Sequence, residues 1–242
     1  LMFLAGNANP RNLRFPPVAT RISSMHAHSA VRSQMTFQQV RAWNVLDEHV
    51  LDVFERLPRE LFVPEAWRGA AYGDLPIALG DGQHMLRPSL AGRLLQSLAI
   101  KRNDRVLEIG TGSGYVTACL AMLATHVLSL EIRPQLAVRA RANLASAAIG
   151  NAEVEEADAF TWDAGSPRFD VVVLTGSMPV YDPRFEAWLR PGGRLFAITG
   201  SAPVMEAMLV RLDSSGTPSR LGLFETVVDA LDHAPAVAKF AF

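Results

Sequence analysis

Residues 105–115 read Arg-Val-Leu-Glu-Ile-Gly-Thr-Gly-Ser-Gly-Tyr, and this stretch decides the fold. Its first part, 105–109, has the apolar character of a short buried strand. Glycines at 110, 112 and 114 then allow a tight turn whose backbone can approach a ligand closely. A helix is expected directly afterwards, over about 115–123. A strand, a glycine-rich turn and a helix in this order predict a nucleotide-binding site.

The spacing of the glycines narrows the kind of nucleotide. A dinucleotide fingerprint reads G-x-G-x-x-G after the strand, whereas here the third glycine comes one residue early and Glu108 precedes the turn. A second strand, over 126–130, ends in Glu131, about 20 residues beyond the turn. A carboxylate there can accept hydrogen bonds from both ribose hydroxyls and disfavours a 2′-phosphate, which argues against NADP. An NAD-dependent oxidoreductase is a poor alternative because of the glycine spacing. The pattern resembles motif I of class I S-adenosylmethionine-dependent methyltransferases.

Composition excludes several other classes of protein. The chain has 242 residues, 49% of them hydrophobic, and a formal net charge of −1. These values suit one domain with a sizeable core and give no basic field for nucleic acid. No apolar run reaches the roughly 18 residues of a membrane span. The single cysteine, Cys119, excludes a disulfide framework, is expected in the core, and predicts a cytoplasmic protein. No Cys/His cluster has zinc spacing, so no metal is predicted.

The chain is expected to form an extension and one domain. Residues 1–34 contain arginines and serines, no acidic residue and no periodicity, which fits a transit peptide, a disordered arm or sequence upstream of the domain. A single methyltransferase domain is predicted over 35–242, with a helical and loop cap over 35–100 and the cofactor-binding sheet over 101–242. Within the cap, apolar spacing predicts a helix over 37–57, or two shorter helices if Asp47 is an N-cap.

Strands and helices alternate along the rest of the chain. Strands are expected over 105–109, 126–130, 153–156, 169–174 and 194–199, and helices over 88–99, 115–123, 134–148 and 183–189, with a turn at 190–193. This alternation predicts an α/β fold with a doubly wound, mainly parallel sheet of the Rossmann-like methyltransferase type. Two further strands, around 205–212 and 221–228, are expected to add an antiparallel edge near the C-terminus.

The carboxyl ends of the strands are where such sheets bind ligands. Asp158 follows the third strand, where it can accept a hydrogen bond from an adenine amino group or, alternatively, only cap the next segment. Thr175 follows the fourth strand, and the sequence Thr175–Pro179 lacks the Asn/Asp-Pro-Pro-Tyr/Phe motif of enzymes that methylate bases. The predicted cofactor-binding residues are Gln83, His84, Glu108, Gly110, Thr111, Gly112, Ser113, Gly114, Glu131, Ile132, Asp158, Ala159 and Thr175.

Several segments from about residue 35 onward match one family of methyltransferases. They are Val45-Leu46-Asp47, Pro58-Arg-Glu-Leu-Phe-Val-Pro64, Ala71-Tyr-Gly-Asp74, Ile77-Ala-Leu-Gly-Asp-Gly-Gln83, residues 105–115 and Leu189-Arg-Pro-Gly-Gly-Arg-Leu195. Through these segments most of the chain resembles the protein-L-isoaspartate O-methyltransferases. The resemblance implies S-adenosyl-L-methionine as cofactor and methyl transfer to the α-carboxylate of an isoaspartyl (D-aspartyl) residue in a protein or peptide, a repair reaction.

One segment departs from the family pattern. Where the family has Thr-Ile-Ser, this chain has His84-Met85-Leu86, followed by Arg87 and Pro88. The resemblance assigns to the Ser the active-site hydroxyl beside the acceptor carboxylate, and Leu86 cannot donate that hydrogen bond. Such a loss costs about 1–3 kcal/mol. Because a carboxylate is already ionised, methyl transfer depends more on orientation than on acid–base help.

Two interpretations of this segment stay open. In the first, the catalytic residues are His84, as a general base for a hydroxyl or amine acceptor, or instead Arg87, which holds an acceptor carboxylate by paired hydrogen bonds. In the second, His84 packs against the cofactor, Met85 and Leu86 line an apolar pocket and Arg87 is solvated. The predicted partner is an isoaspartyl protein or peptide, with no nucleic acid and no membrane. The alternatives are a methyltransferase for a small molecule or another protein group, and a non-catalytic cofactor-binding protein.

Overall fold

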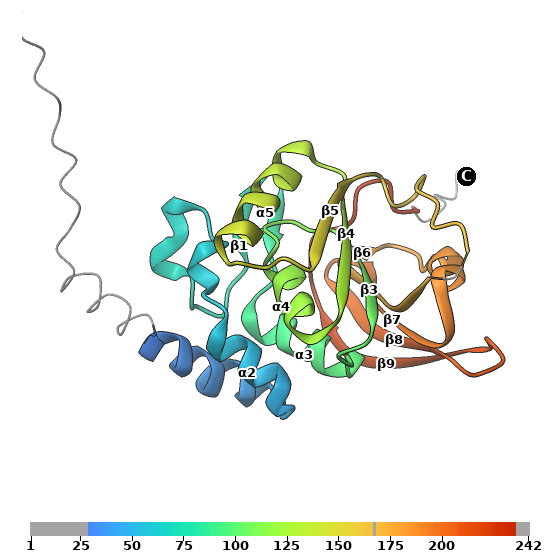
Figure 1. Ribbon diagram of the computed structural model, residues 1–242, viewed down its shortest axis with the longest axis horizontal. Helices are drawn as coiled ribbons and strands as arrows, with labels where there is room; N and C mark the ends of the chain where they lie inside the picture. The colour runs from blue at the N-terminus through green and yellow to red at the C-terminus, as the bar shows by residue number, and fades with distance from the viewer. Residues whose placement is uncertain (1–28, 167, 236–242) are drawn as a thin grey trace, which may run out of the picture.

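The computed structural model describes residues 29–166 and 168–235, and within them a seven-stranded sheet has the order β5-β4-β3-β6-β7-β8-β9 (Figure 1). The first five strands along the chain pair in parallel, and the last two add antiparallel pairing at one edge. This arrangement confirms the predicted fold class. The strands are β3 (Arg105–Ile109), β4 (His126–Glu131), β5 (Ala152–Glu156), β6 (Phe169–Met178), β7 (Leu189–Ser201), β8 (Val204–Leu212) and β9 (Pro218–Thr226).

The two faces of the sheet bury different sets of side chains, because neighbouring residues of a strand point to opposite faces. Val106 of β3 packs with the helices of one face, whereas Leu107 packs into a second cluster on the other. The first face is covered by α3 (Pro88–Leu98), α4 (Tyr115–Leu123) and α5 (Pro134–Ser146), and α2 (Glu48–Arg56) packs on α3 and α4. The second face is covered by irregular chain and by η5 (Pro183–Trp188), a 3₁₀-helix where the sequence predicted a longer helical segment.

Strand β7 shows how one detail of the sequence prediction has to be modified. The predicted turn at 190–193 lies inside the strand, because Leu189 pairs with Phe169 and the next pair is Arg194 with Val171. The residues between them bulge out of the ladder, and Gly192 has φ 80°. Turn and strand are therefore both present, and the strand begins before the turn instead of after it.

The helical cap begins with a helix at residues 29–35, followed by η1 (Thr36–Val40) and η2 (Arg41–Trp43). Asp47 accepts a hydrogen bond from the His49 backbone N–H at 2.9 Å and caps α2, so the two-helix alternative is correct. Residues 1–28 of the predicted extension lie outside the described part of the chain. Residues 29–34 belong to the first helix, and the Ser33 hydroxyl donates to Glu55 at 2.7 Å. The division into cap and sheet near residue 100 stays a prediction.

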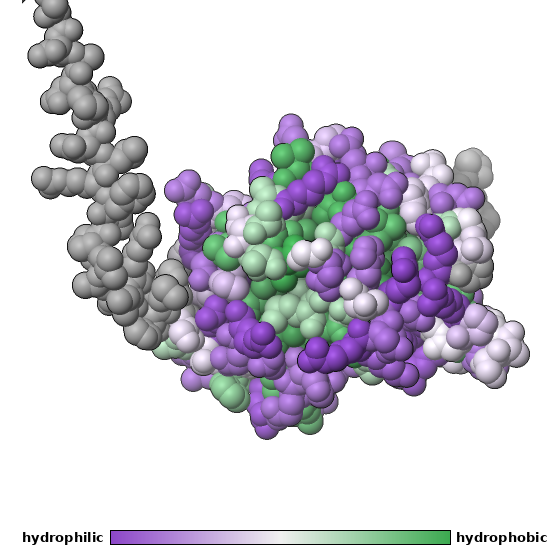
Figure 2. Space-filling model, in the orientation of Figure 1, coloured by the Kyte–Doolittle hydropathy of each residue, from purple (hydrophilic) through white to green (hydrophobic). Residues whose placement is uncertain are grey.

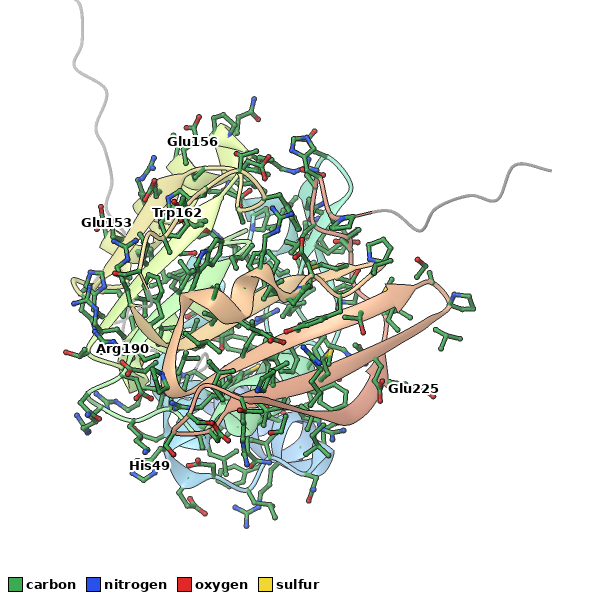
Figure 3. All side chains as sticks on the ribbon, turned by 90° about the vertical axis from the view of Figure 1, so that its right-hand side faces the viewer. His49, Glu153, Glu156, Trp162, Arg190 and Glu225 are labelled. Carbon is green, nitrogen blue, oxygen red and sulfur yellow. The ribbon has the colours of Figure 1, made fainter. Side chains whose placement is uncertain are left out.

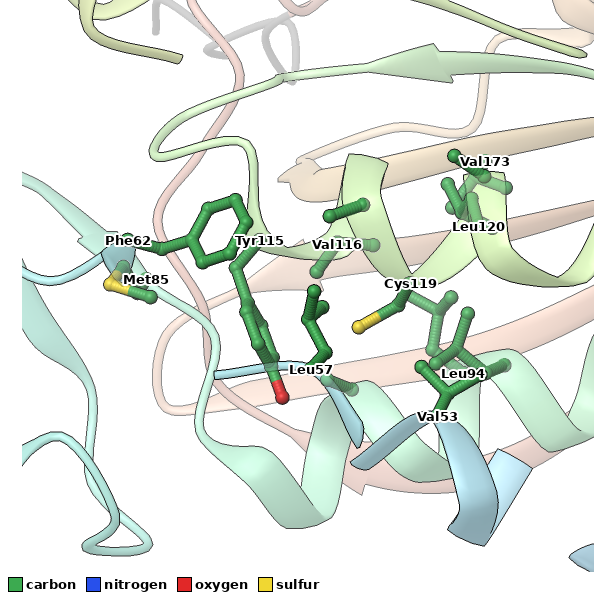
Figure 4. Close-up of a cluster of buried hydrophobic side chains, with 14 of the residues drawn as sticks. Val53, Leu57, Phe62, Met85, Leu94, Tyr115, Val116, Cys119, Leu120 and Val173 are labelled. Carbon is green, nitrogen blue, oxygen red and sulfur yellow. The ribbon is translucent and has the colours of Figure 1, made fainter. Parts of the chain in front are cut away.

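The cap continues through η3 (Arg59–Leu61) and η4 (Glu65–Ala70) to a two-stranded hairpin of β1 (Ile77–Gly80) and β2 (Gln83–Met85). A buried aromatic contact joins this cap to the sheet domain. The Tyr115 ring, at the start of α4, packs edge-on against Phe62 with centroids 5.5 Å apart, and both lie in the cluster of Figure 4. Cys119 lies in the same cluster, and burial raises the pKa of its thiol to about 12.

The surface shows where charge and apolar groups gather. Apolar side chains lie toward the middle of the face in Figure 2, with hydrophilic groups around them. The two edge strands carry exposed carboxylates at opposite ends of the sheet, Glu153 and Glu156 on β5 and Glu225 on β9 (Figure 3). No helix among the described residues is long and apolar enough to cross a membrane.

Candidate cofactor and acceptor site

The glycine turn joins β3 to α4 in a conformation that only glycine adopts without strain. Gly110, Gly112 and Gly114 all have positive φ, at 92°, 56° and 83°. A Cβ on Gly110 would lie 2.6 Å from Thr175 Oγ1. Thr175 in turn donates to the Ile109 carbonyl at 3.0 Å. The turn is therefore fixed both by its own backbone and by the end of β6.

Glu131 closes the turn from the end of β4. One carboxylate oxygen accepts the Gly112 N–H at 2.8 Å, and the other accepts the Arg133 N–H at 3.0 Å. Burial raises the pKa of this carboxyl, and the two N–H donors and the Arg133 charge partly oppose that rise. Each carboxylate oxygen can accept more than one hydrogen bond. Glu131 also lines the cavity described below, so it can hold the turn and accept from two ligand hydroxyls together.

Glu108 lies behind the turn and does not line the cavity. Its Oε2 accepts from Thr117 at 2.5 Å and from Ser129 at 2.6 Å, and Ser129 also bonds Thr111 at 2.6 Å. Burial raises the pKa of Glu108 to about 8, against the lowering effect of the two hydroxyl donors. Its other oxygen has no partner among the described residues. The geometry thus gives Glu108 a supporting role under the turn, and corrects the expectation that it contacts the cofactor directly.

A cavity of about 500 Å³ opens at the carboxyl ends of β3, β4, β5 and β6. The strand order reverses between β3 and β6, which is where ligands of doubly wound sheets bind. The volume of the cavity falls in the range of small-molecule sites. Gly114, the N-cap of α4, faces Ala140 instead of the cavity. The predicted cofactor residues that line the cavity are Gln83, His84, Gly110, Thr111, Gly112, Ser113, Glu131, Ile132, Asp158, Ala159 and Thr175.

A segment that sequence reasoning did not include also lines the cavity: residues 227–232, which follow β9. We call residues 227–235 the C-terminal segment. It is tied to the end of β6 by two backbone hydrogen bonds, from Ser177 N to the Asp229 carbonyl at 2.8 Å and from Leu231 N to the Ser177 carbonyl at 2.9 Å. Asp232 pairs with Arg133 at 2.8 Å. No local sequence pattern predicts that the C-terminal segment lies beside the end of β6, because the contact joins positions about 50 residues apart.

Asp158 has two protein partners in addition to its place in the cavity wall. One oxygen caps the Phe160 N–H at 2.9 Å, as in the capping alternative, and the other lies 2.7 Å from His233 Nδ1. The hydrogen bond to Asp158 raises the pKa of His233. Its predicted contact with an adenine amino group stays a prediction.

The residues predicted to face the acceptor lie on β2 and directly after it. His84, Leu86 and Arg87 all line the cavity. The Leu86 carbonyl accepts from Arg59 Nη2 at 2.9 Å, and burial lowers the pKa of that guanidinium. The Arg87 guanidinium lies 5.0 Å from the centre of the Trp43 ring, in a cation–π contact. The role of Arg87 in binding the acceptor stays a prediction.

The sequence model of the protein-L-isoaspartate(D-aspartate) O-methyltransferase family matches residues 31–220. The chain belongs to this family. A protein-L-isoaspartate O-methyltransferase of Methanoculleus marisnigri is 36% identical over 87% of this chain and 93% of its own length. Protein-L-isoaspartate O-methyltransferase 1 of Rhodopseudomonas palustris is 37% identical over 82% of this chain and 80% of its own.

Solved structures of the same family share the fold. A structure described as a Plasmodium falciparum protein-L-isoaspartate O-methyltransferase with S-adenosyl-L-homocysteine superposes with a TM-score of 0.72 at 18% identity, covering 85% of this chain and 98% of that one. A second protein-L-isoaspartate O-methyltransferase gives 0.71 at 21% identity, covering 83% and 65%. Family membership confirms the resemblance seen in the sequence, and the family is one of S-adenosylmethionine-dependent methyltransferases.

Proposed function

We propose that this protein is an S-adenosylmethionine-dependent methyltransferase that methylates the α-carboxylate of isoaspartyl residues in proteins or peptides. The observation that carries the proposal is Glu131, held between the glycine turn and the cavity at the point where the strand order reverses. Family membership supplies the reaction class. A cytoplasmic location is supported by a single, buried cysteine.

The residues present fit the cofactor. Glu131 would accept from the two ribose hydroxyls and Asp158 from the adenine amino group, while the turn at Gly110 and Gly112 leaves room for close approach because neither carries a Cβ. When bound, S-adenosylmethionine supplies an electrophilic methyl group on a sulfonium. The chain contributes orientation and exclusion of water, which is what a carboxylate nucleophile needs since it is already ionised at neutral pH.

A second candidate is methylation of a small molecule or of another protein group by the same site. The observation in its favour is Leu86, an apolar side chain in the cavity wall where the family has a hydroxyl. With Met85 and Leu90, it makes this part of the wall apolar. A smaller, less polar acceptor would suit such a wall.

Calorimetry with S-adenosylhomocysteine tests the cofactor assignment. Glu131→Gln is expected to weaken binding about 10- to 100-fold, because hydrogen bonds to a charged group contribute about 1.5–3 kcal/mol. Glu156→Gln is the matched control, since Glu156 is exposed and pairs with Glu131 across β4 and β5; its affinity should equal that of the wild type. No binding by the wild type, or equal binding by both variants, would contradict the assignment.

Methyl transfer to an isoaspartyl peptide tests the acceptor. The wild type is expected to methylate the isoaspartyl peptide and not the same peptide with a normal aspartyl linkage. Binding of S-adenosylhomocysteine without turnover on either peptide would leave the cofactor site in place and favour the second candidate, which a screen of hydroxyl and carboxyl compounds would then examine.

A further inference from the structure

One carboxylate oxygen of Asp229, in the C-terminal segment, contacts two nitrogen atoms of His84. Asp229 Oδ2 accepts the His84 backbone N–H at 2.7 Å and lies 3.1 Å from ring atom Nδ1 of the same residue. The two residues are 145 positions apart. Both line the cavity, and the side chains of His84 and Asp229 are only partly exposed, at 39% and 31%. The contact thus holds both the β2 backbone and the imidazole ring.

The position of Asp229 is determined by its own backbone. Ser177 at the end of β6 donates its N–H to the Asp229 carbonyl at 2.8 Å, and Ala230 forms a parallel bridge with Ser177. The neighbouring cation Arg133 pairs with Asp232 at 2.8 Å. The Asp229 carboxylate is therefore directed at His84 by a backbone that the sheet itself anchors.

The contact at Nδ1 leaves Nε2 as the ring atom available to a ligand. No hydrogen bond to Nε2 is formed within the described residues. A carboxylate at Nδ1 fixes the orientation of a histidine ring and the chemistry of its other nitrogen. An acceptor carboxylate that approaches Nε2 meets a ring whose other nitrogen already contacts a carboxylate, so the ring can donate to both only when each nitrogen carries a proton.

We propose that Asp229 is a positioning residue, which orients His84 so that Nε2–H donates to the carboxylate of the methyl acceptor. His84 then provides the hydrogen-bond donor that Leu86 cannot. The inference rests on the proposed function for the nature of the acceptor. The other charged groups lining the same cavity are Arg59, Arg87, Glu131, Arg133, Asp158 and Asp232.

Steady-state kinetics on the isoaspartyl peptide test the proposal with two variants and their combination. Asp229→Asn should raise KM for the peptide about tenfold, the loss of one charge-assisted hydrogen bond, with S-adenosylhomocysteine affinity within about twofold of wild type. His84→Gln removes the ring that Asp229 orients and should raise KM for the peptide about as much as Asp229→Asn does.

The double variant separates a positioning role from a general structural one. If Asp229 acts through His84, adding Asp229→Asn to His84→Gln should change KM less than about twofold. An equal tenfold loss in both backgrounds, or a wild-type KM in Asp229→Asn alone, would overturn the proposal.

Failure of the proposed function gives a different result. If the wild type binds S-adenosylhomocysteine but does not methylate the peptide, the peptide is titrated into the S-adenosylhomocysteine complex and the His84 ring nitrogens are followed by NMR. A shift of Nε2 on peptide addition that is lost in Asp229→Asn supports the inference without turnover. No shift at saturating peptide, or no binding of the peptide, overturns it.

Discussion

The cavity has two ends that are built in different ways. The proposed cofactor end, residues 105–115 with Glu131, is made from consecutive elements, so that the turn and its carboxylate come from β3, α4 and β4. The proposed acceptor end, residues 84–87 with Arg59 and Asp229, joins three distant parts of the chain. The first end depends on backbone conformation and the second on contacts between remote side chains. Substitutions should therefore affect the two ends by different mechanisms and by different amounts.

The largest effect is expected from Gly110→Ala, which attacks the cofactor end at its backbone. Strain at φ 92° and a Cβ placed 2.6 Å from Thr175 Oγ1 should together cost about 2–5 kcal/mol. Affinity for S-adenosylhomocysteine, measured by calorimetry, should fall about 30-fold or more. The control is Gly216→Ala, which has φ 84° but no atom within 4 Å of its added Cβ. Equal binding by the Gly110 variant would show that the turn tolerates a side chain.

The next effect is a pH dependence of stability that arises from Glu108, which supports the glycine turn from behind. Glu108 has a pKa of about 8 when folded, raised by burial from an ordinary value of 4.5. Its contribution to stability is therefore complete below pH 4.5 and is lost as pH rises through about 8. Between pH 5 and pH 8 the loss should be on the order of 3–4 kcal/mol.

Urea unfolding from pH 5 to pH 8 checks this in Glu108→Gln. The glutamine oxygen can accept from Thr117 and Ser129, and the amide replaces an oxygen that has no partner among the described residues. Because glutamine does not titrate, the variant should become more stable than the wild type as pH rises. Glu153→Gln, at an exposed position of the edge strand β5, is the control. Its free energy of unfolding should change with pH as that of the wild type does. Parallel curves for wild type and Glu108→Gln would refute the prediction.

The smallest effect is expected at the acceptor end, from Leu86→Ser. A restored hydroxyl should raise kcat/KM for the isoaspartyl peptide by only about fivefold, or about 1 kcal/mol, because His84 already offers a donor. Stability should fall by about 1–2 kcal/mol since Leu86 packs against the core. Leu221→Ser, on an exposed position of β9, should change neither quantity. A decrease in kcat/KM would mean that the acceptor prefers the apolar wall.

The elements around the glycine turn were predictable because their signals are local. The buried strand at 105–109, the turn and the helix after it follow from hydrophobic runs and three glycines within a few residues. Asp47 as an N-cap was also visible, as one of two alternatives. The extent of β7 was not, because its first pair, Leu189 with Phe169, depends on a neighbouring strand and on a bulge that no local pattern reveals.

The sequence by itself determined the fold class, the family and the glycine turn with its carboxylate, because these depend on periodicity, on positive φ at glycine and on an acidic residue at a strand end. Only the tertiary structure decided which side chains face the cavity. It placed Glu108 behind the turn and brought Asp229 to His84 across 145 positions. The physical reason is that a hydrogen bond between distant residues depends on how the sheet packs and where the chain returns. Neither is a property of the residues beside it in the sequence.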